Sequence, residues 1–146
     1  MNSGIKKQTV SSTERDYYKL WTPVTIRYGD TDRQGHINNA AYSTFFESGR
    51  VDFLCNEAGT IAGPGYSFVI AKITLDFLQE MNFPGTVEVG SRISNIGRSS
   101  CTIKQALFKD GVCCSTAESI IVLTDDNTKR STELPESVLS VLKNLY

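Results

Sequence analysis

The sequence contains a single histidine, His36, and only four prolines among its 146 residues. It has no run near the roughly 20 apolar residues that a membrane-spanning helix needs. The polar N-terminal segment also lacks the apolar stretch of a secretory signal. With a net charge of −1, the chain has no long-range attraction to nucleic acid or to anionic lipid. We therefore expect neither a nucleic-acid nor a membrane partner.

The four cysteines lack the spacing typical of a metal site. Cys113 and Cys114 are adjacent on a predicted strand, so their side chains should point to opposite faces. Without an export signal, free thiols and a cytoplasmic location are the better interpretation. The sequence also lacks a Gly-x-Ser-x-Gly motif, a Cys-His motif and a Gly-rich phosphate loop. Nothing therefore indicates a serine or cysteine nucleophile.

What the sequence does contain is the composition of an ordinary globular domain, with 40% hydrophobic residues. Its length fits one domain around a single core. Residues 1–20 are rich in Ser, Thr and Lys, and we predict that they form a flexible N-terminal extension. The folded domain is predicted to span residues 21–146.

One long helix is predicted for residues 39–58, because apolar side chains recur there at helical spacing. Asn38 or Asn39 is expected to cap its start, and Gly59 to end it. The buried stripe consists of Tyr42, Phe46, Gly49 and Phe53.

Strand patterns lie on both sides of this helix. A first strand is predicted over residues 22–28, and strands over residues 67–123 are separated by turns near 82–85, 97–100 and 109–112. Asp110-Gly111 is the clearest hairpin signal. A short helix is predicted to begin at residues 134–136. One helix against an antiparallel sheet long enough to curl around it is an α+β arrangement.

The polar turn before the long helix holds Asp30, Asp32 and His36. The turn begins like a calcium loop, but Ala41 occupies the position where that loop needs a bidentate Glu. A metal ion held by the three side chains is a weaker alternative, because the signal is one short turn with mixed ligands. We predict no metal site.

A carboxylate just before a helix N-terminus suits acyl transfer. Unpaired N–H groups at the helix start can stabilise an oxyanion, and the carboxylate can attack a carbonyl or activate water. The alternative is that Asp30 and Asp32 only hydrogen-bond the turn, as Asp commonly does. The pattern alone favours this structural alternative.

Residues 28–50 contain two sequence segments that are more specific to a protein family than the turn pattern alone. They are Tyr28-Gly-Asp-Thr-Asp-Arg-Gln-Gly-His-Ile-Asn-Asn-Ala-Ala-Tyr42 and Phe45-Phe-Glu-Ser-Gly-Arg50. Together they resemble the signature of hotdog-fold acyl-CoA thioesterases, in particular the 4-hydroxybenzoyl-CoA thioesterase-like group. In element order the resemblance covers residues 22–145. It implies a long central helix wrapped by a curved antiparallel sheet of about five strands, and a homodimer or homotetramer with sites between subunits.

The resemblance also implies an activity, the hydrolysis of an acyl-CoA thioester to a free acid and CoA. Asp32 matches the catalytic nucleophile or general base. The Asn39 backbone N–H matches the group that polarises the thioester carbonyl, and His36 matches an assisting histidine. Gln34 stands where the acyl-carrier-protein branch has a catalytic Asn, and Glu47 is expected to support the site or to pair with Arg50.

Coenzyme A carries phosphates, and three residues resemble the family positions that hold its nucleotide: Arg98, Ser99 and Arg130. Coenzyme A is part of the substrate, so no separate cofactor is expected. Two alternatives remain on the same fold. One is a non-catalytic acyl-CoA-binding protein. The other is an enoyl-CoA hydratase or dehydratase, although the Asp-x-Asn-Pro-x-His pattern usual for that class is absent.

Overall fold

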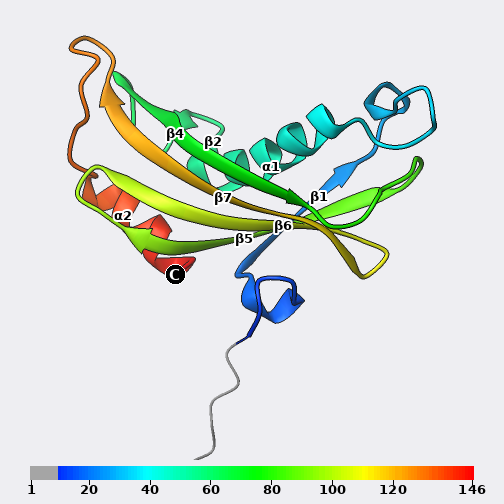
Figure 1. The fold of residues 1–146 in the computed structure, drawn as a ribbon. Coiled ribbons are helices and arrows are strands. Elements are labelled where there is room, and N and C mark those ends of the chain that lie inside the picture. Colours follow the sequence, from blue (N-terminus) through cyan, green and yellow to red (C-terminus); the bar gives the residue numbers. More distant parts are fainter. Residues whose placement is uncertain (1–9) are drawn as a thin grey trace, which may run out of the picture.

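A five-stranded antiparallel sheet curves around one long helix in the computed structural model, which describes residues 10–146 (Figure 1). The strands lie in the order β1-β5-β6-β7-β4. Their bounds are Leu20–Thr25 for β1, Tyr66–Phe77 for β4, Thr86–Ile96 for β5, Ser100–Lys109 for β6 and Val112–Asp125 for β7. The predicted α+β hotdog architecture with about five strands is confirmed.

The sheet curves partly because its long strands contain bulges. The register shifts between Ile70 and Lys72, between Ile93 and Asn95, and between Leu107 and Phe108. Each bulge adds a residue to one strand and increases its local bend. At the predicted hairpin turn, Asp110 and Gly111 both have positive φ, at 51° and 79°. Such a turn matches the twist of the two strands that it joins.

Helix α1 (Asn39–Leu54) begins where its cap was predicted but ends four residues early. The Asn38 Oδ1 atom accepts a hydrogen bond from the Ala40 N–H at 2.9 Å. After Leu54, the chain forms a small hairpin of β2 (Cys55–Asn56) and β3 (Gly59–Thr60). The Ile61 N–H then donates to the Leu54 carbonyl at 2.9 Å and satisfies the helix end. The prediction that Gly59 stops the helix was therefore wrong.

Helix α1 packs on the concave face of the sheet, and its stripe is the centre of the core. Phe46 is fully buried there, among side chains of β5, β6 and β7. A second apolar cluster continues towards the far end of the sheet, where the C-terminal helix α2 (Glu136–Asn144) covers it with Val138 and Leu142. The predicted stripe therefore contributes to both clusters, with Phe46 in the first and Phe53 in the second, and the terminal helix completes the second.

Ordered structure begins before the predicted boundary at residue 21. A 3-10 turn η1 (Arg15–Tyr17) leads into Tyr18, which is only 6% exposed. Tyr18 contacts Trp21 and Phe108 edge-on, on the sheet face opposite α1. This aromatic packing holds the segment on the sheet, whereas residues 1–9 of the predicted extension lie outside the described residues. The first strand also lies earlier than predicted, at residues 20–25 instead of 22–28.

The cysteines and the helices bear on the predictions of free thiols and of no membrane-spanning helix. All four cysteines lie within residues 10–146, and each is a free thiol. No helix in this described range is both long and apolar enough to cross a membrane.

Candidate active site

The turn between η2 (Tyr28–Asp30) and α1 holds Asp32 in a fixed orientation. The Asp32 N–H donates to the His36 carbonyl at 2.7 Å. One carboxylate oxygen, Oδ1, accepts the N–H groups of Gln34 at 2.8 Å and of His36 at 3.1 Å. The other oxygen, Oδ2, accepts no hydrogen bond from residues 10–146. Asp32 therefore both shapes the turn and keeps one oxygen available.

A cavity of about 200 Å³ lies beside this turn. It is lined by Asp32, Gln34, His36, Ile37, Asn39, Tyr42, Glu80 and Met81. The fold thus brings the three predicted catalytic residues to one cavity. Two of them contribute side chains, and the third lies at the first position of α1.

The backbone N–H of Asn39 has no protein acceptor among the described residues. Of its neighbours, Ala40 donates to the Asn38 side chain and Ala41 donates to the Asn38 carbonyl at 2.9 Å. The first N–H groups of a helix lack partners within the helix, and the helix dipole makes this end electropositive. The Asn39 N–H is therefore a free donor beside the Asp32 carboxylate.

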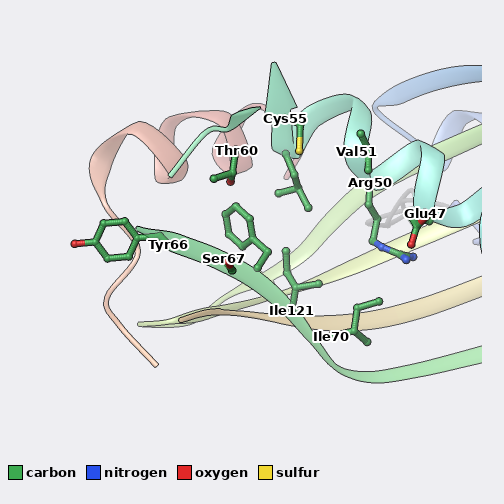
Figure 2. A pocket seen from close by; sticks show the side chains of 11 residues that line it. Glu47, Arg50, Val51, Cys55, Thr60, Tyr66, Ser67, Ile70 and Ile121 are labelled. Atoms are coloured by element: carbon green, nitrogen blue, oxygen red, sulfur yellow. The ribbon is translucent and has the colours of Figure 1, made fainter. Parts of the chain in front are cut away.

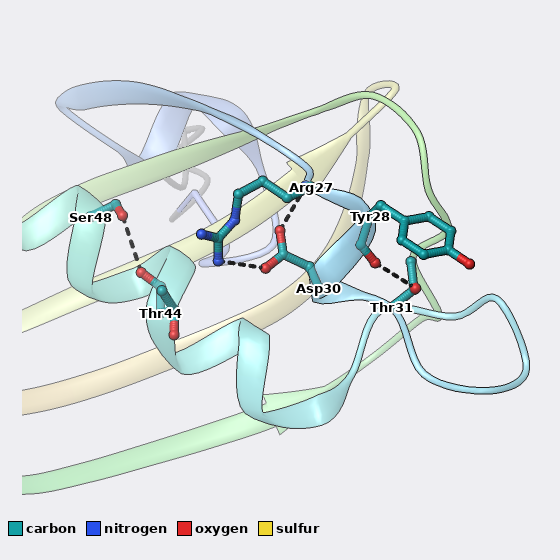
Figure 3. A network of polar contacts seen from close by, with 6 residues as sticks. All are labelled: Arg27, Tyr28, Asp30, Thr31, Thr44 and Ser48. Carbon is teal, nitrogen blue, oxygen red and sulfur yellow. Dashed lines mark hydrogen bonds and ion pairs between the residues drawn. The ribbon is translucent and has the colours of Figure 1, made fainter.

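Asp30 is buried and belongs to the turn, not to the cavity. Its carboxylate accepts the Arg27 backbone N–H at 2.7 Å and the Arg27 guanidinium at 2.9 Å (Figure 3). Burial alone would raise the pKa of Asp30, but these hydrogen bonds outweigh it and lower that pKa below its ordinary value. The two acidic residues of the turn therefore have different roles. Between residues 10 and 146, no group of three His, Cys, Asp or Glu side chains is placed to hold a metal ion.

Glu80 joins this site from a distant part of the chain. Its Oε2 atom lies 3.3 Å from His36 Nε2. The contact arises because the chain after β4 runs beside the turn, where the Ile37 N–H donates to the Met81 carbonyl at 2.9 Å. Sequence reasoning missed Glu80, because nothing in the local pattern places residue 80 next to residue 36.

The predicted coenzyme A residues lie at the other end of the sheet. The Arg98 carbonyl accepts from Leu134, the Ser99 carbonyl from Leu123, and the Arg130 carbonyl from Asp125. These loops surround the end of β7, which pairs with the beginning of β4 at Tyr66. Asp32 instead lies near the chain that follows the other end of β4. Within one subunit, the structure does not bring the two sets together.

A second cavity, of about 350 Å³, lies between α1 and the first half of β4 (Figure 2). Glu47 and Arg50 both line it. The ion pairs of the described residues do not include one between these two side chains. Arg50 donates instead to the side chain of Gln105 at 3.4 Å.

The site therefore combines a carboxylate with a free oxygen, an imidazole and an unpaired helix N–H around one cavity. The N–H can donate a hydrogen bond to a carbonyl oxygen on which negative charge develops. The carboxylate can attack the carbonyl carbon or remove a proton from water. These are the groups that acyl transfer to water requires.

Comparison with known proteins relates this arrangement to an enzyme family. The sequence model of the thioesterase-like superfamily matches residues 26–142. The acyl-CoA thioester hydrolase YbgC of Escherichia coli is 23% identical over 125 residues, which are 83% of this chain and 93% of that protein. An acyl-acyl carrier protein thioesterase of Arabidopsis thaliana chloroplasts is 28% identical over 123 residues, covering 79% and 63% of the two chains.

Solved structures show the same fold. The PA5185 protein of Pseudomonas aeruginosa superposes with a TM-score of 0.83 at 26% identity, over 90% of this chain and 94% of that one. A Thermus thermophilus thioesterase solved with coenzyme A and zinc superposes with a TM-score of 0.75 at 24% identity, over 89% and 96% of the chains. Since the family match spans most of the chain and the fold agrees, this protein is a hydrolase that belongs to the thioesterase-like superfamily.

Proposed function

We propose that this protein hydrolyses acyl-CoA thioesters to a free carboxylic acid and CoA, with Asp32 as the catalytic carboxylate. The observation that carries this proposal is the shared cavity, where the Asp32 carboxylate and the free Asn39 N–H lie together at the start of α1. Relatives support the substrate class. The E. coli relative is named an acyl-CoA thioester hydrolase, and a Staphylococcus aureus protein of the same fold was solved with CoA.

In this mechanism the thioester carbonyl oxygen accepts a hydrogen bond from the Asn39 N–H. The positive end of α1 stabilises the negative charge that develops on this oxygen. The free Asp32 oxygen either attacks the carbonyl carbon or takes a proton from a water that attacks it. In the first route the CoA thiolate departs and the acyl group stays bonded to Asp32 as a mixed anhydride, which water then hydrolyses. In the second route CoA leaves directly. Neither route needs a metal ion or a further cofactor.

Glu80 and His36 assist as a pair in this proposal. The Glu80 Oε2 atom lies 3.3 Å from His36 Nε2, and this contact orients the imidazole ring at the cavity wall. The opposite ring nitrogen, Nδ1, is then available to the substrate or to the attacking water. His36 assists the reaction, and Glu80 positions His36.

We further propose that the active form is a homodimer, or a homotetramer built from such dimers, in which two β4 strands pair along their free edges. β1 and β4 are the two edges of the sheet. β1 contains Pro23, which cannot donate to a further strand. β4 contains no proline and exposes large apolar side chains, including Ile70 and Phe77. An exposed apolar strand edge favours pairing with a second chain.

This pairing would complete the site. In an antiparallel two-fold pair, the Tyr66 end of one β4 lies beside the Phe77 end of the other. The Asp32 cavity of one subunit then approaches the loops with Arg98, Ser99 and Arg130 of the second subunit. These basic and hydroxyl groups can hold the phosphates of the CoA moiety.

A thiol-release assay on short, long and aromatic acyl-CoAs tests the proposed activity. Asp32→Asn should lower kcat/KM by about 100-fold to 10,000-fold, the range for loss of a catalytic acid or base. Stability should change little, because the Asn oxygen still accepts the Gln34 and His36 N–H groups. Asp110→Asn, in an exposed hairpin turn that tolerates Asn, is the matched control and should keep full activity.

Three results would contradict the proposal. Wild-type turnover by Asp32→Asn would remove Asp32 from the mechanism. Binding of acyl-CoA without thiol release would indicate a binding protein, and loss of enoyl-CoA absorbance without thiol release would indicate a hydratase.

A further inference from the structure

The cavity between α1 and β4 has mainly apolar walls, and two charged side chains, the buried Arg50 and the exposed Glu47, line it. Its apolar lining includes Val51, Leu54, Phe68, Ile70 and Ile121. Figure 2 shows Arg50 and Glu47 together at one end of this lining. The volume of about 350 Å³ is at the lower end of the roughly 300–1,000 Å³ typical of ligand sites. The cavity therefore fits a short chain better than a long one.

The Arg50 guanidinium forms no ion pair with residues 10–146. The residue is only 5% exposed, and its single hydrogen bond goes to Gln105 Oε1 at the long distance of 3.4 Å. No carboxylate of residues 10–146 lies within 4.0 Å of it. Burial lowers the pKa of Arg50, and nearby Glu47 opposes this shift. A guanidinium nevertheless stays charged in proteins.

Gln105 does not satisfy this charge. Its amide nitrogen is committed, because Nε2 donates to the Phe46 carbonyl and to Ser91 Oγ, both at 3.0 Å. The amide oxygen that faces Arg50 is neutral and supplies one acceptor for a group with five N–H donors. A buried charge of this kind is costly unless an anion or several acceptors compensate it. The compensating group must then enter from the cavity.

We propose that this cavity is the acyl pocket and that Arg50 binds a carboxylate at the far end of the acyl group. The preferred substrates would be short ω-carboxyacyl-CoAs, the monothioesters of dicarboxylic acids. This inference rests on the proposed thioesterase function and on the β4-paired dimer. In that dimer, the cavity at the Tyr66–Ile70 end of one β4 adjoins the Asp32 cavity at the Phe77 end of the other.

Glu47 modulates this preference and does not cancel it. Its side chain is exposed, so water and salt screen its charge more than that of Arg50. A bound carboxylate would accept hydrogen bonds from the buried guanidinium while Glu47 repels it weakly. Removing the Glu47 charge should therefore strengthen binding of an ω-carboxyl group.

The test compares substrates of equal chain length that differ only at the far end. For wild-type enzyme, kcat/KM should be about tenfold or more higher for glutaryl-CoA than for pentanoyl-CoA, because a hydrogen bond to a charged group contributes roughly this factor. Adipyl-CoA and hexanoyl-CoA form a second pair. A hydroxylated chain, 5-hydroxypentanoyl-CoA, should fall between the two members of the first pair.

Variants assign this preference to the cavity. Arg50→Met should abolish the preference for glutaryl-CoA over pentanoyl-CoA, whereas Arg50→Lys should keep part of it. Glu47→Gln should lower KM for glutaryl-CoA only. Val51→Glu adds a negative charge from an exposed helix position and should selectively weaken glutaryl-CoA turnover relative to its neutral control, Val51→Gln. This second pair gives a result even if the Arg50 variants do not fold.

The inference fails if wild-type enzyme hydrolyses both members of each substrate pair equally. It also fails if Arg50→Met changes the mass of the assembly in solution but not the preference for ω-carboxyacyl-CoAs. Arg50 would then pair with a second copy of the chain. Absence of thiol release from every acyl-CoA would instead contradict the proposed function itself.

Discussion

Asp30 and Asp32, in the turn before α1, show how burial and hydrogen bonding give two identical side chains different roles. Asp30 and Asp32 are two residues apart, yet both hydrogen bonds to the Asp30 carboxylate come from Arg27, while Asp32 keeps one carboxylate oxygen free at a cavity. The first is a structural group with a lowered pKa. The second is the candidate catalyst. Burial and hydrogen bonding decide this difference, because the two side chains are chemically the same.

The pH dependence of stability should report on Asp30. A carboxyl group with a lowered folded-state pKa stabilises the fold above its ordinary pKa of 3.8, and this stabilisation is lost as the pH falls through the folded-state pKa. Asp30→Asn should therefore cost about 1–2 kcal/mol at pH 7. The difference between wild type and variant should shrink below about pH 4.

Urea unfolding at pH 7, 5 and 3 measures this difference. Asp110→Asn is again the control, since an exposed turn residue should show no such trend. A difference between wild type and Asp30→Asn that stays constant down to pH 3 would show that the carboxylate charge does not matter.

The His36–Glu80 contact predicts a coupled effect on activity. If Glu80 acts only by holding His36, then Glu80→Gln and His36→Ala should each lower kcat, and the double variant should lose no more than His36→Ala alone. Thiol-release kinetics on the wild type, the two single variants and the double variant give the coupling between the two residues in kcat. Independent, multiplicative losses would mean that Glu80 acts on the substrate directly.

At the scale of elements, the position of α1 depends on a glycine. A Cβ atom at Gly49 would lie 2.5 Å from Val89 Cγ1 and 2.8 Å from Gln105 Nε2. Val89 is fully buried and Gln105 is fixed by its hydrogen bonds. The helix therefore lies as close to β5 and β6 as a residue without a side chain allows.

Gly49→Ala should destabilise the protein although Ala is the better helix former. The gain in helix propensity is about 1 kcal/mol, and overpacking a filled core costs typically 1–3 kcal/mol. We expect a net loss of up to about 2 kcal/mol in the free energy of unfolding. Ser43→Ala, at an exposed position of the same helix, should be neutral or slightly stabilising. A more stable Gly49→Ala protein would show that the sheet yields easily.

At the scale of the whole molecule, the exposed apolar edge of β4 supports the proposed second subunit. The strand is rich in apolar residues, yet every one of its residues is exposed or only half-buried. Val69, Ile70 and Phe77 remain 44–53% exposed. The residues proposed to bind coenzyme A also lie far from Asp32 within one chain. These two observations are the main support for the proposed second subunit.

Ile73→Asp should separate the subunits and abolish activity together. Ile73 is exposed on β4, so the single chain should fold normally, while two new negative charges oppose each other across the strand pair. Light scattering after size exclusion should show the mass of a monomer. Val112→Asp, an equal change at an exposed site on a different hairpin, should leave mass and turnover unaltered. An active monomer would contradict the composite site.

The sequence by itself determined the features that depend on near neighbours. Helical spacing located α1, Asn38 marked its start, and Asp110-Gly111 marked a hairpin. The order of elements predicted the α+β fold, and the turn signature predicted Asp32, His36 and Asn39 as one site. The helix, its start, the hairpin and the fold class follow from local backbone geometry and hydrophobic periodicity, which act over a few residues, whereas the site was implied by the resemblance of residues 28–50 to a family signature.

Only the tertiary structure decided what depends on distant neighbours. Helix α1 ends at Leu54 because Ile61 returns to its last carbonyl, and Tyr18 is ordered because it packs on Phe108. Glu80 contacts His36 although α1 and β4 lie between them in the sequence. Arg50 is buried beside a cavity and forms no ion pair with residues 10–146. No local pattern encodes such contacts, because the free energy of burying a group depends on which remote residues the fold brings against it.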